Sequence, residues 1–160
     1  MIERKITPYL LKMARYFPVV TIMGPRQSGK TTLARTIFPN HVYVNLEDKT
    51  AREIALSDPK AFFSLYKAPV IIDEVQRVPD LLSTIQVLAD ETREKGRFIL
   101  TGSHQPKLHA EISQSLAGRT GILHLLPLSI EELSKAGVSL SRDDYLFNGF
   151  MPRLYDENIR

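Results

Sequence analysis

The stretch of residues 24–31, GPRQSGKT, constrains the fold of this chain most, because it fits the phosphate-binding pattern G-x-x-x-x-G-K-[ST] at every fixed position. That pattern is informative only where a buried strand leads into a loop and the loop opens a helix. Residues 19–23, VVTIM, form a β-branched apolar run typical of a strand covered on both faces. Downstream, Leu33, Ala34 and Ile37 recur at helical spacing. The sequence therefore predicts a strand, a phosphate-binding loop and a helix in succession.

The predicted roles follow from the chemistry of such a loop. Its backbone N–H groups turn toward phosphate oxygens at the positive end of the following helix. Lys30 then reaches the β- and γ-phosphates, and the Thr31 hydroxyl helps to hold Mg²⁺. An ordinary glycine-rich turn with a solvated lysine is the alternative. The residues predicted to contact the nucleotide are Gly24, Pro25, Arg26, Gln27, Ser28, Gly29, Lys30, Thr31 and Thr32.

Length and composition indicate one globular domain. The chain has 160 residues, enough to bury a core, and no cysteine, which excludes disulfides and thiolate metal sites. The N-terminus lacks the apolar core of a signal peptide, and no apolar run approaches membrane-spanning length. We therefore expect a soluble cytoplasmic protein without a membrane partner.

Positive charge is concentrated in the first quarter of the chain, although the net charge is only +3. A polyphosphate would partly neutralise the basic residues in and near the loop. The others are typical of a solvated helix face, and contact with nucleic acid stays open as the alternative. These other residues are Arg4, Lys5, Lys12 and Arg15.

Strand and helix patterns alternate along the chain. Residues 6–17 have the spacing of an amphipathic helix, and Ser129 with Glu132 forms a capping-box pattern for a helix ending at Gly137. A helix beginning at Pro79-Asp80 is expected to close at Gly96. This alternation predicts an α/β fold with a parallel sheet. Strands are predicted at residues 19–23, 42–46, 70–72, 97–101 and 122–126.

The predicted organisation has two parts. Residues 1–140 form the nucleotide-binding domain, with the amphipathic helix in front of it. The segment that begins at Arg142 has no clear core pattern of its own. We therefore expect residues 141–160 to be the start of a truncated C-terminal region.

Two acidic residues follow the third predicted strand directly. In an open α/β sheet, ligands lie at the carboxyl ends of the strands, where Asp73 and Glu74 are placed. We assign Asp73 to Mg²⁺, opposite Thr31, and Glu74 to the attacking water. Taken alone, VIIDE is equally consistent with a buried strand followed by two solvated acids.

The end of the fourth strand supplies candidate γ-phosphate sensors, namely Thr101, Ser103 and His104, although Ser103 also suits a simple turn cap. No DxxG follows the Asp73 strand and no NKxD is present, which disfavours a GTPase. The adjacent Glu74 favours hydrolysis by activated water over transfer to a second substrate. Arg119, in SLAGR, is a candidate arginine finger acting in cis or in trans, and a helix-terminal salt bridge is the equal alternative.

Five blocks together resemble one known family. GPRQSGKTTL, VIIDEVQ, FILTGSHQ, SLAGRTGILHLLPLSIEEL and GFMPRLY are similar, in this order, to the prokaryotic AAA-type ATPases of the AAA+ superfamily, relatives of archaeal ATPases. The resemblance covers about residues 18–155. Two blocks depart from it: His104 stands where the family reads TGSSQ, and residues 149–152 read GFMP where it reads GGFP.

The resemblance implies a P-loop NTPase fold, a three-layer αβα sandwich with strand order 5-1-4-3-2. It assigns Lys30 and Thr31 to the nucleotide loop, Asp73 and Glu74 to hydrolysis, and it matches Arg119 to the family arginine. It also implies a further C-terminal domain. The expected function is Mg²⁺-dependent ATP hydrolysis that drives or regulates that domain, and a nucleotide-binding switch with negligible turnover is the alternative.

Overall fold

A computed structural model describes residues 2–103 and 105–155 of the chain. Five strands form one sheet in which every pairing is parallel, in the order β2-β3-β4-β1-β5. Counted from the other edge, this is the predicted order 5-1-4-3-2. The strands are β1 (Val19–Gly24), β2 (Val42–Asn45), β3 (Val70–Asp73), β4 (Phe98–Ser103) and β5 (Thr120–His124).

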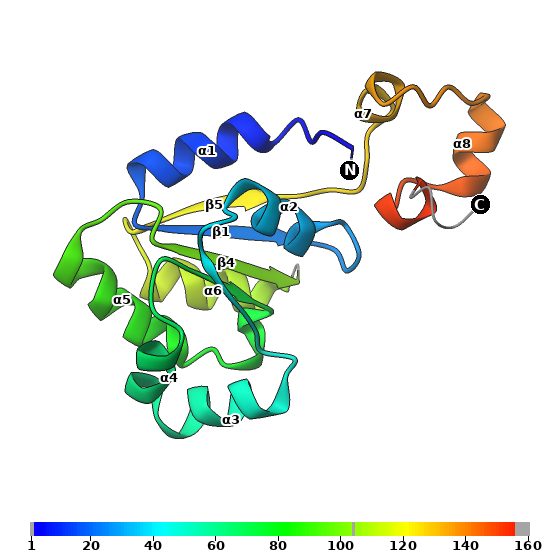
Figure 1. Ribbon diagram of the computed structural model, residues 1–160. Coiled ribbons are helices and arrows are strands. Elements are labelled where there is room, and N and C mark those ends of the chain that lie inside the picture. The colour runs from blue at the N-terminus through cyan, green and yellow to red at the C-terminus, as the bar shows by residue number, and fades with distance from the viewer. Residues whose placement is uncertain (1, 104, 156–160) are drawn as a thin grey trace.

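Helices cover both faces of the sheet and so complete the predicted three-layer sandwich (Figure 1). One face packs α1 and α2 against Val20, Ile22 and Ile71, and the other packs helices α3 to α6 around Phe62, Ile85 and their neighbours. The helices are α1 (Thr7–Tyr16), α2 (Lys30–Ile37), α3 (Lys49–Ser57), α4 (Pro59–Leu65), α5 (Leu81–Thr92), α6 (Pro106–Ser115), α7 (Ile130–Lys135) and α8 (Arg142–Asn148), with short 3₁₀ helices η1 (Val75–Arg77) and η2 (Pro152–Tyr155).

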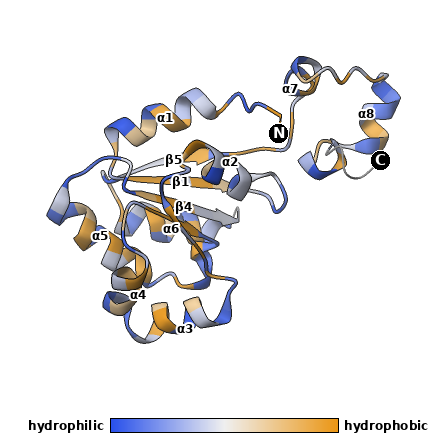
Figure 2. Ribbon diagram, in the orientation of Figure 1, coloured by the Kyte–Doolittle hydropathy of each residue, from blue (hydrophilic) through white to orange (hydrophobic). Residues whose placement is uncertain are grey.

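The sequence pattern explains this layering. β1, β3 and β4 are buried along their whole length, as expected of parallel strands covered on both faces. The helices around them mix apolar and polar residues (Figure 2), so that each helix buries one stripe and leaves the other in water. Within the described part of the chain, every helix is too short or too polar to cross a bilayer.

Several predicted boundaries were wrong by two residues or more, and the fourth strand ends at Ser103 instead of residue 101. The fifth strand begins and ends two residues earlier than predicted. The Leu125 N–H still donates to the carbonyl of Met23, but the carbonyl of Leu126 accepts from the Arg4 side chain and not from a strand. Helix α5 ends at Thr92, because Arg93 adopts the left-handed conformation that caps it. Gly96, the predicted stop, instead donates its N–H to the carbonyl of Phe17.

The segment after Arg142 packs onto the residues that precede it, although its sequence shows no clear core pattern of its own. Ser141 caps α8 by accepting a hydrogen bond from the Asp144 N–H, and Tyr145 is buried. We call this small hydrophobic unit the C-terminal cluster. It consists of Leu128, Leu133 and Tyr145, with Ile2, Val138, Leu140, Phe150 and Tyr155 packed against them. It lies at the end of the sheet to which β5 leads (Figure 1).

Candidate nucleotide site

The phosphate-binding loop joins the carboxyl end of β1 to the first turn of α2, where it was predicted. Gly24 is close-packed, because a Cβ there would lie 2.2 Å from the carbonyl oxygen of Leu125. Gly29 has φ +93°, a left-handed conformation that L side chains avoid. Its added Cβ would meet no protein atom closer than 3.5 Å, so the backbone conformation rather than space is what requires glycine there.

The N–H groups of Lys30, Thr31 and Thr32 lie in the first turn of α2, where helix geometry leaves them without intrahelical acceptors. Ser28 is fully buried, and its Oγ has no hydrogen-bond partner among the described residues. Arg26 and Gln27 are exposed at the tip of the loop. Together these groups form a cradle of donors, which is the chemistry that an anionic phosphate needs.

Lys30 is folded onto the loop that it follows. Its Nζ donates hydrogen bonds to the carbonyl oxygens of Pro25 at 2.8 Å and Gly24 at 3.1 Å, and the side chain is only 5% exposed. Burial lowers the pKa of Lys30, while the negative charges of Glu74 and Asp73 oppose that shift. A phosphate oxygen would give this ammonium a stronger, charged partner than two carbonyls.

The Asp73 carboxylate is buried at the end of β3 and receives three hydroxyl donors. The Thr31 Oγ1 lies 3.0 Å from Oδ1 and 2.9 Å from Oδ2. Tyr43 donates to Oδ2 at 2.9 Å, and Thr101 donates to Oδ1. The expected meeting of Thr31 with Asp73 is therefore present.

The donor set at Asp73 fits Mg²⁺, which prefers oxygen ligands and retains several waters. One carboxylate and one hydroxyl would hold the ion against phosphate oxygens. Among residues 2–103 and 105–155, no group of three or more His, Cys, Asp or Glu side chains is placed to hold a metal.

Glu74 is held by a neighbour that the sequence analysis did not assign. It adopts φ +60°, and its N–H donates to the Thr101 hydroxyl at 3.1 Å. The Gln76 amide nitrogen donates both to the Glu74 carboxylate and to Ser103 Oγ, the latter at 2.8 Å. Ser103 lies beside Gly24 in the sheet register, so the predicted sensor is adjacent to the loop.

Tyr43 and Gln76 are therefore site residues that sequence reasoning missed. Tyr43 lies on β2, next to the Asp73 strand, and burial together with its hydrogen bond to Asp73 raises its pKa. The Arg35 guanidinium lies 4.6 Å from the centre of its ring. The sequence does offer a signal for Gln76, because a residue two positions after Glu74 is close enough along the chain to contact its carboxylate. His104, the other predicted sensor, lies outside the described residues.

Arg119 lies at the opposite end of the sheet. It precedes β5 and accepts a hydrogen bond from the N–H of Val19, the first residue of β1. β1 spans roughly 16 Å at about 3.3 Å per residue, so this backbone is far from the loop at the other end. Its guanidinium forms two hydrogen bonds with Asp90, at 2.7 and 2.8 Å. This placement argues against a role in cis.

Comparison with known proteins agrees with this geometry. The family model described as "AAA domain" matches residues 16–134. Uncharacterized proteins of Mycobacterium tuberculosis and Mycobacterium bovis are each 34% identical over 138 residues, or 85% of this chain. The chain spans 31% of the length of these relatives.

Solved structures share the fold. A Walker-type ATPase of Pyrococcus abyssi is similar with a TM-score of 0.65 and 15% identity, over 95% of this chain and 65% of that one. DnaA of Aquifex aeolicus bound to AMPPCP is similar with a TM-score of 0.61 and 18% identity, over 97% of this chain and 58% of that one.

Proposed function

This chain belongs to the AAA domain family, and we propose that it binds ATP with Mg²⁺ at residues 24–31 and hydrolyses it to ADP and phosphate. The observation that carries the proposal is the meeting of Thr31 with Asp73 beside the loop, with Glu74 as the next residue. Two separate segments, the loop at residues 24–31 and the end of β3, would supply a phosphate cradle, oxygen ligands for a cation and a carboxylate base.

The loop residues would bind and orient the phosphates. Lys30 exchanges its two loop carbonyls for β- and γ-phosphate oxygens, and the first-turn N–H groups of α2 bind the same oxygens. Asp73 and Thr31 would hold Mg²⁺, which supplies charge neutralisation on the phosphates. The three hydroxyl donors on Asp73 fix its orientation before any ligand arrives.

Glu74 would accept a proton from water while the water oxygen bonds to the γ-phosphorus. The bond from that phosphorus to the β,γ-bridging oxygen breaks, and ADP retains the bridging oxygen. Ser103, which accepts a hydrogen bond from Gln76, would sense the γ-phosphate through it. For Glu74 to act as the base, the hydrogen bond that Gln76 donates to its carboxylate must be replaced by one from the attacking water.

That hydrogen bond favours a second candidate function. If Gln76 keeps Glu74 occupied, the chain would hold ATP with negligible turnover and act as a nucleotide-dependent switch. In either case we propose that the regulated element is a further part of the polypeptide, since the relatives are about three times as long as the matched region. Arg119 would act in trans within a homo-oligomer.

Calorimetric titration with ATP and Mg²⁺, followed by phosphate release, tests the proposal. We expect the wild type to bind ATP and Lys30→Ala to bind it at least about tenfold more weakly, given the contribution of a charge-assisted contact. Lys12→Ala, on the exposed face of α1, is the matched control and should bind normally. Equal affinity in wild type and Lys30→Ala would refute the site. Binding without phosphate release would favour the switch.

A further inference from the structure

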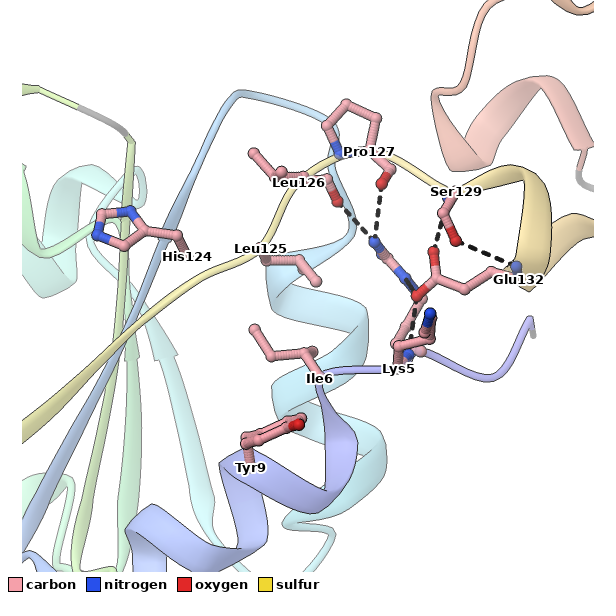
Figure 3. A pocket seen from close by; sticks show the side chains of 10 residues that line it. Lys5, Ile6, Tyr9, His124, Leu125, Leu126, Pro127, Ser129 and Glu132 are labelled. Carbon is pink, nitrogen blue, oxygen red and sulfur yellow. Dashed lines mark hydrogen bonds and ion pairs between the residues drawn. The ribbon is translucent and has the colours of Figure 1, made fainter.

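The Arg4 side chain is buried between the phosphate-binding loop and the C-terminal cluster, with 6% exposure. Its Nη1 donates to the Ser28 carbonyl at 2.8 Å, and its Nε donates to Glu132 Oε1 at 3.2 Å. Its Nη2 donates to the carbonyls of Leu126 at 2.6 Å and Pro127 at 3.3 Å. Figure 3 shows the carbonyls of Leu126 and Pro127 and the carboxylate of Glu132 directed toward this one point. One guanidinium thus joins the loop, the end of β5 and α7.

The partner carboxylate is itself fixed. Glu132 is 6% exposed and accepts hydrogen bonds from the backbone N–H groups of Ser129 and Lys5, both at 2.8 Å. Burial raises the pKa of Glu132, but these hydrogen bonds and the charge of Arg4 outweigh it and hold the pKa below its usual value. The Glu132 carboxylate is therefore ionised near neutral pH, and it cannot move without disturbing the start of α7.

The contact with Ser28 has a consequence for phosphate binding. In a trans peptide, the C=O of one residue and the N–H of the next point in opposite directions. Because Arg4 holds the Ser28 carbonyl on its own side, the N–H of Gly29 points away from Arg4. That N–H belongs to the loop pattern whose donors face phosphate. Arg4 thereby sets the plane of the peptide that joins Ser28 to Gly29.

Pro152, which lies between the cluster residues Phe150 and Tyr155 in the chain, is near the same glycine. An added Cβ on Gly29 would have Arg4 Nη1 at 3.5 Å and Pro152 Cγ at 3.6 Å as its neighbours. The chain around Pro152 is tied to the cluster, since the Leu128 N–H donates to the carbonyl of Phe150 at 2.7 Å. Arg4 and Pro152 therefore both lie beside Gly29, one from the segment before α1 and the other from the segment that carries Phe150 and Tyr155.

We propose that Arg4 is a positioning residue that couples the conformation of the phosphate-binding loop to the seating of the C-terminal cluster through Glu132. Any ligand that fixes the Ser28–Gly29 peptide then stabilises the cluster, and loosening of the cluster disorders the loop. The inference rests on the proposed function only in naming ATP as that ligand. It corrects the sequence-based assignment of Arg4 to a solvated helix face or to nucleic acid, because the side chain is neither exposed nor on a helix.

A matched pair of substitutions on α7 tests the coupling without nucleotide. Glu132→Gln retains one side-chain oxygen, which can accept from the Ser129 N–H because glutamine also suits this position of a capping box. It removes the charge, and it replaces Oε1, which accepts from both Arg4 and the Lys5 N–H, by an NH₂ group that cannot accept. Glu131→Gln, the control, makes the same chemical change at the adjacent residue, whose side chain forms an exposed ion pair with Lys5. We expect hydrogen exchange at the Gly29 and Lys30 amides to be about tenfold faster in Glu132→Gln and unchanged in Glu131→Gln.

Equal exchange at those loop amides in the two variants would overturn the coupling. Arg4→Lys is a further check, because it keeps the positive charge but removes the planar guanidinium. A lysine ammonium cannot donate to Ser28 and Glu132 with the same geometry, so Arg4→Lys should behave as Glu132→Gln does. Thermal unfolding of each variant establishes that the sheet remains folded.

Addition of ATP and Mg²⁺ provides the second measurement. In the wild type and in Glu131→Gln, nucleotide should slow exchange in α7 and α8 as well as in α2. In Glu132→Gln it should slow exchange in α2 alone, a separation that mere loss of stability would not produce. Wild-type protection confined to α2 would overturn the proposed coupling. If the wild type binds no ATP, the proposed function fails, and the comparison without nucleotide decides the coupling by itself.

Discussion

The two ends of the parallel sheet differ in how they hold their charged residues. At the carboxyl ends of the strands, Asp73 is 3% exposed and accepts hydrogen bonds from side chains on three other segments. At the amino ends, Arg119 and Asp90 form a pair whose side chains are 31% and 52% exposed. A buried carboxylate with several donors is pre-organised, whereas an exposed pair is held weakly and is readily exchanged.

If the proposed function is right, this difference separates what one molecule does alone from what needs a second copy. The carboxyl end would then supply the groups that hold a phosphate and a cation. The amino end presents Arg119, which lies far from its own loop and is partly exposed. The comparison predicts that substitutions at the carboxyl end act within each molecule, while substitution of Arg119 acts between molecules.

The largest effect is expected from Arg119→Ala. If Arg119 completes the site of a neighbouring subunit, wild-type phosphate release per subunit should rise with protein concentration, and Arg119→Ala should release phosphate about 10³-fold more slowly at the highest concentration. ATP affinity should not change. Arg93→Ala, on the same surface, is the control. If turnover depends neither on protein concentration nor on Arg119, the proposed difference in role between the two ends of the sheet is wrong.

Glu74→Gln should slow phosphate release by about 10²-fold or more, because the amide cannot take the proton from water. The loss should be the same at every protein concentration, unlike that of Arg119→Ala. ATP affinity should be retained, since Lys30 and the loop are unaltered. Steady-state phosphate release and calorimetry measure the two quantities. A proportional loss of binding would show that Glu74 holds nucleotide rather than water.

Tyr43→Phe should lower the affinity for Mg²⁺ in the presence of ATP by about tenfold. This is the lower end of the range for loss of a group that orients a metal ligand. It removes only the hydroxyl that donates to Asp73. Tyr16→Phe, at the exposed end of α1, makes the same change away from the site. The measurement is ATP affinity across a Mg²⁺ titration. Identical titrations for the two variants would exclude Tyr43 from the site.

Local patterns predicted much of this molecule. The loop, the alternation of strands and helices and the position of Asp73 each follow from a short stretch of sequence, and the family resemblance implied the strand order. The missed residues depend on long-range packing. Tyr43 reaches Asp73 across 30 residues, and Arg4 reaches Glu132 across 128. No periodicity in the sequence distinguishes the buried Arg4 from the exposed Lys5 beside it.

The C-terminal cluster was missed for a related reason. Tyr145 lies on a helix too short to show an apolar stripe, and its partners Leu128 and Leu133 come from the preceding segments. Gly96 illustrates the reverse error. A glycine after a helix predicts where the helix ends, but here Arg93 adopts the left-handed conformation first and ends α5. Gly96 also has a positive φ, and its N–H donates to the carbonyl of Phe17.

The smallest effect is expected from Asp90→Asn, which tests whether the amino-end pair is as weakly held as its exposure indicates. Hydrogen bonding to Arg119 lowers the pKa of Asp90 from its usual value of 3.8. A carboxylate with a lowered pKa contributes stability above its unfolded pKa and loses it as the pH falls through the folded value. The difference in unfolding midpoint between wild type and Asp90→Asn should therefore be small at pH 7, begin to shrink below about pH 3.8 and disappear once the pH is below the lowered pKa of Asp90. Added salt should shrink it, and phosphate release should not fall, because Arg119 is freed rather than lost. A large midpoint difference that persists in salt would mean that this end of the sheet is as firmly built as the other.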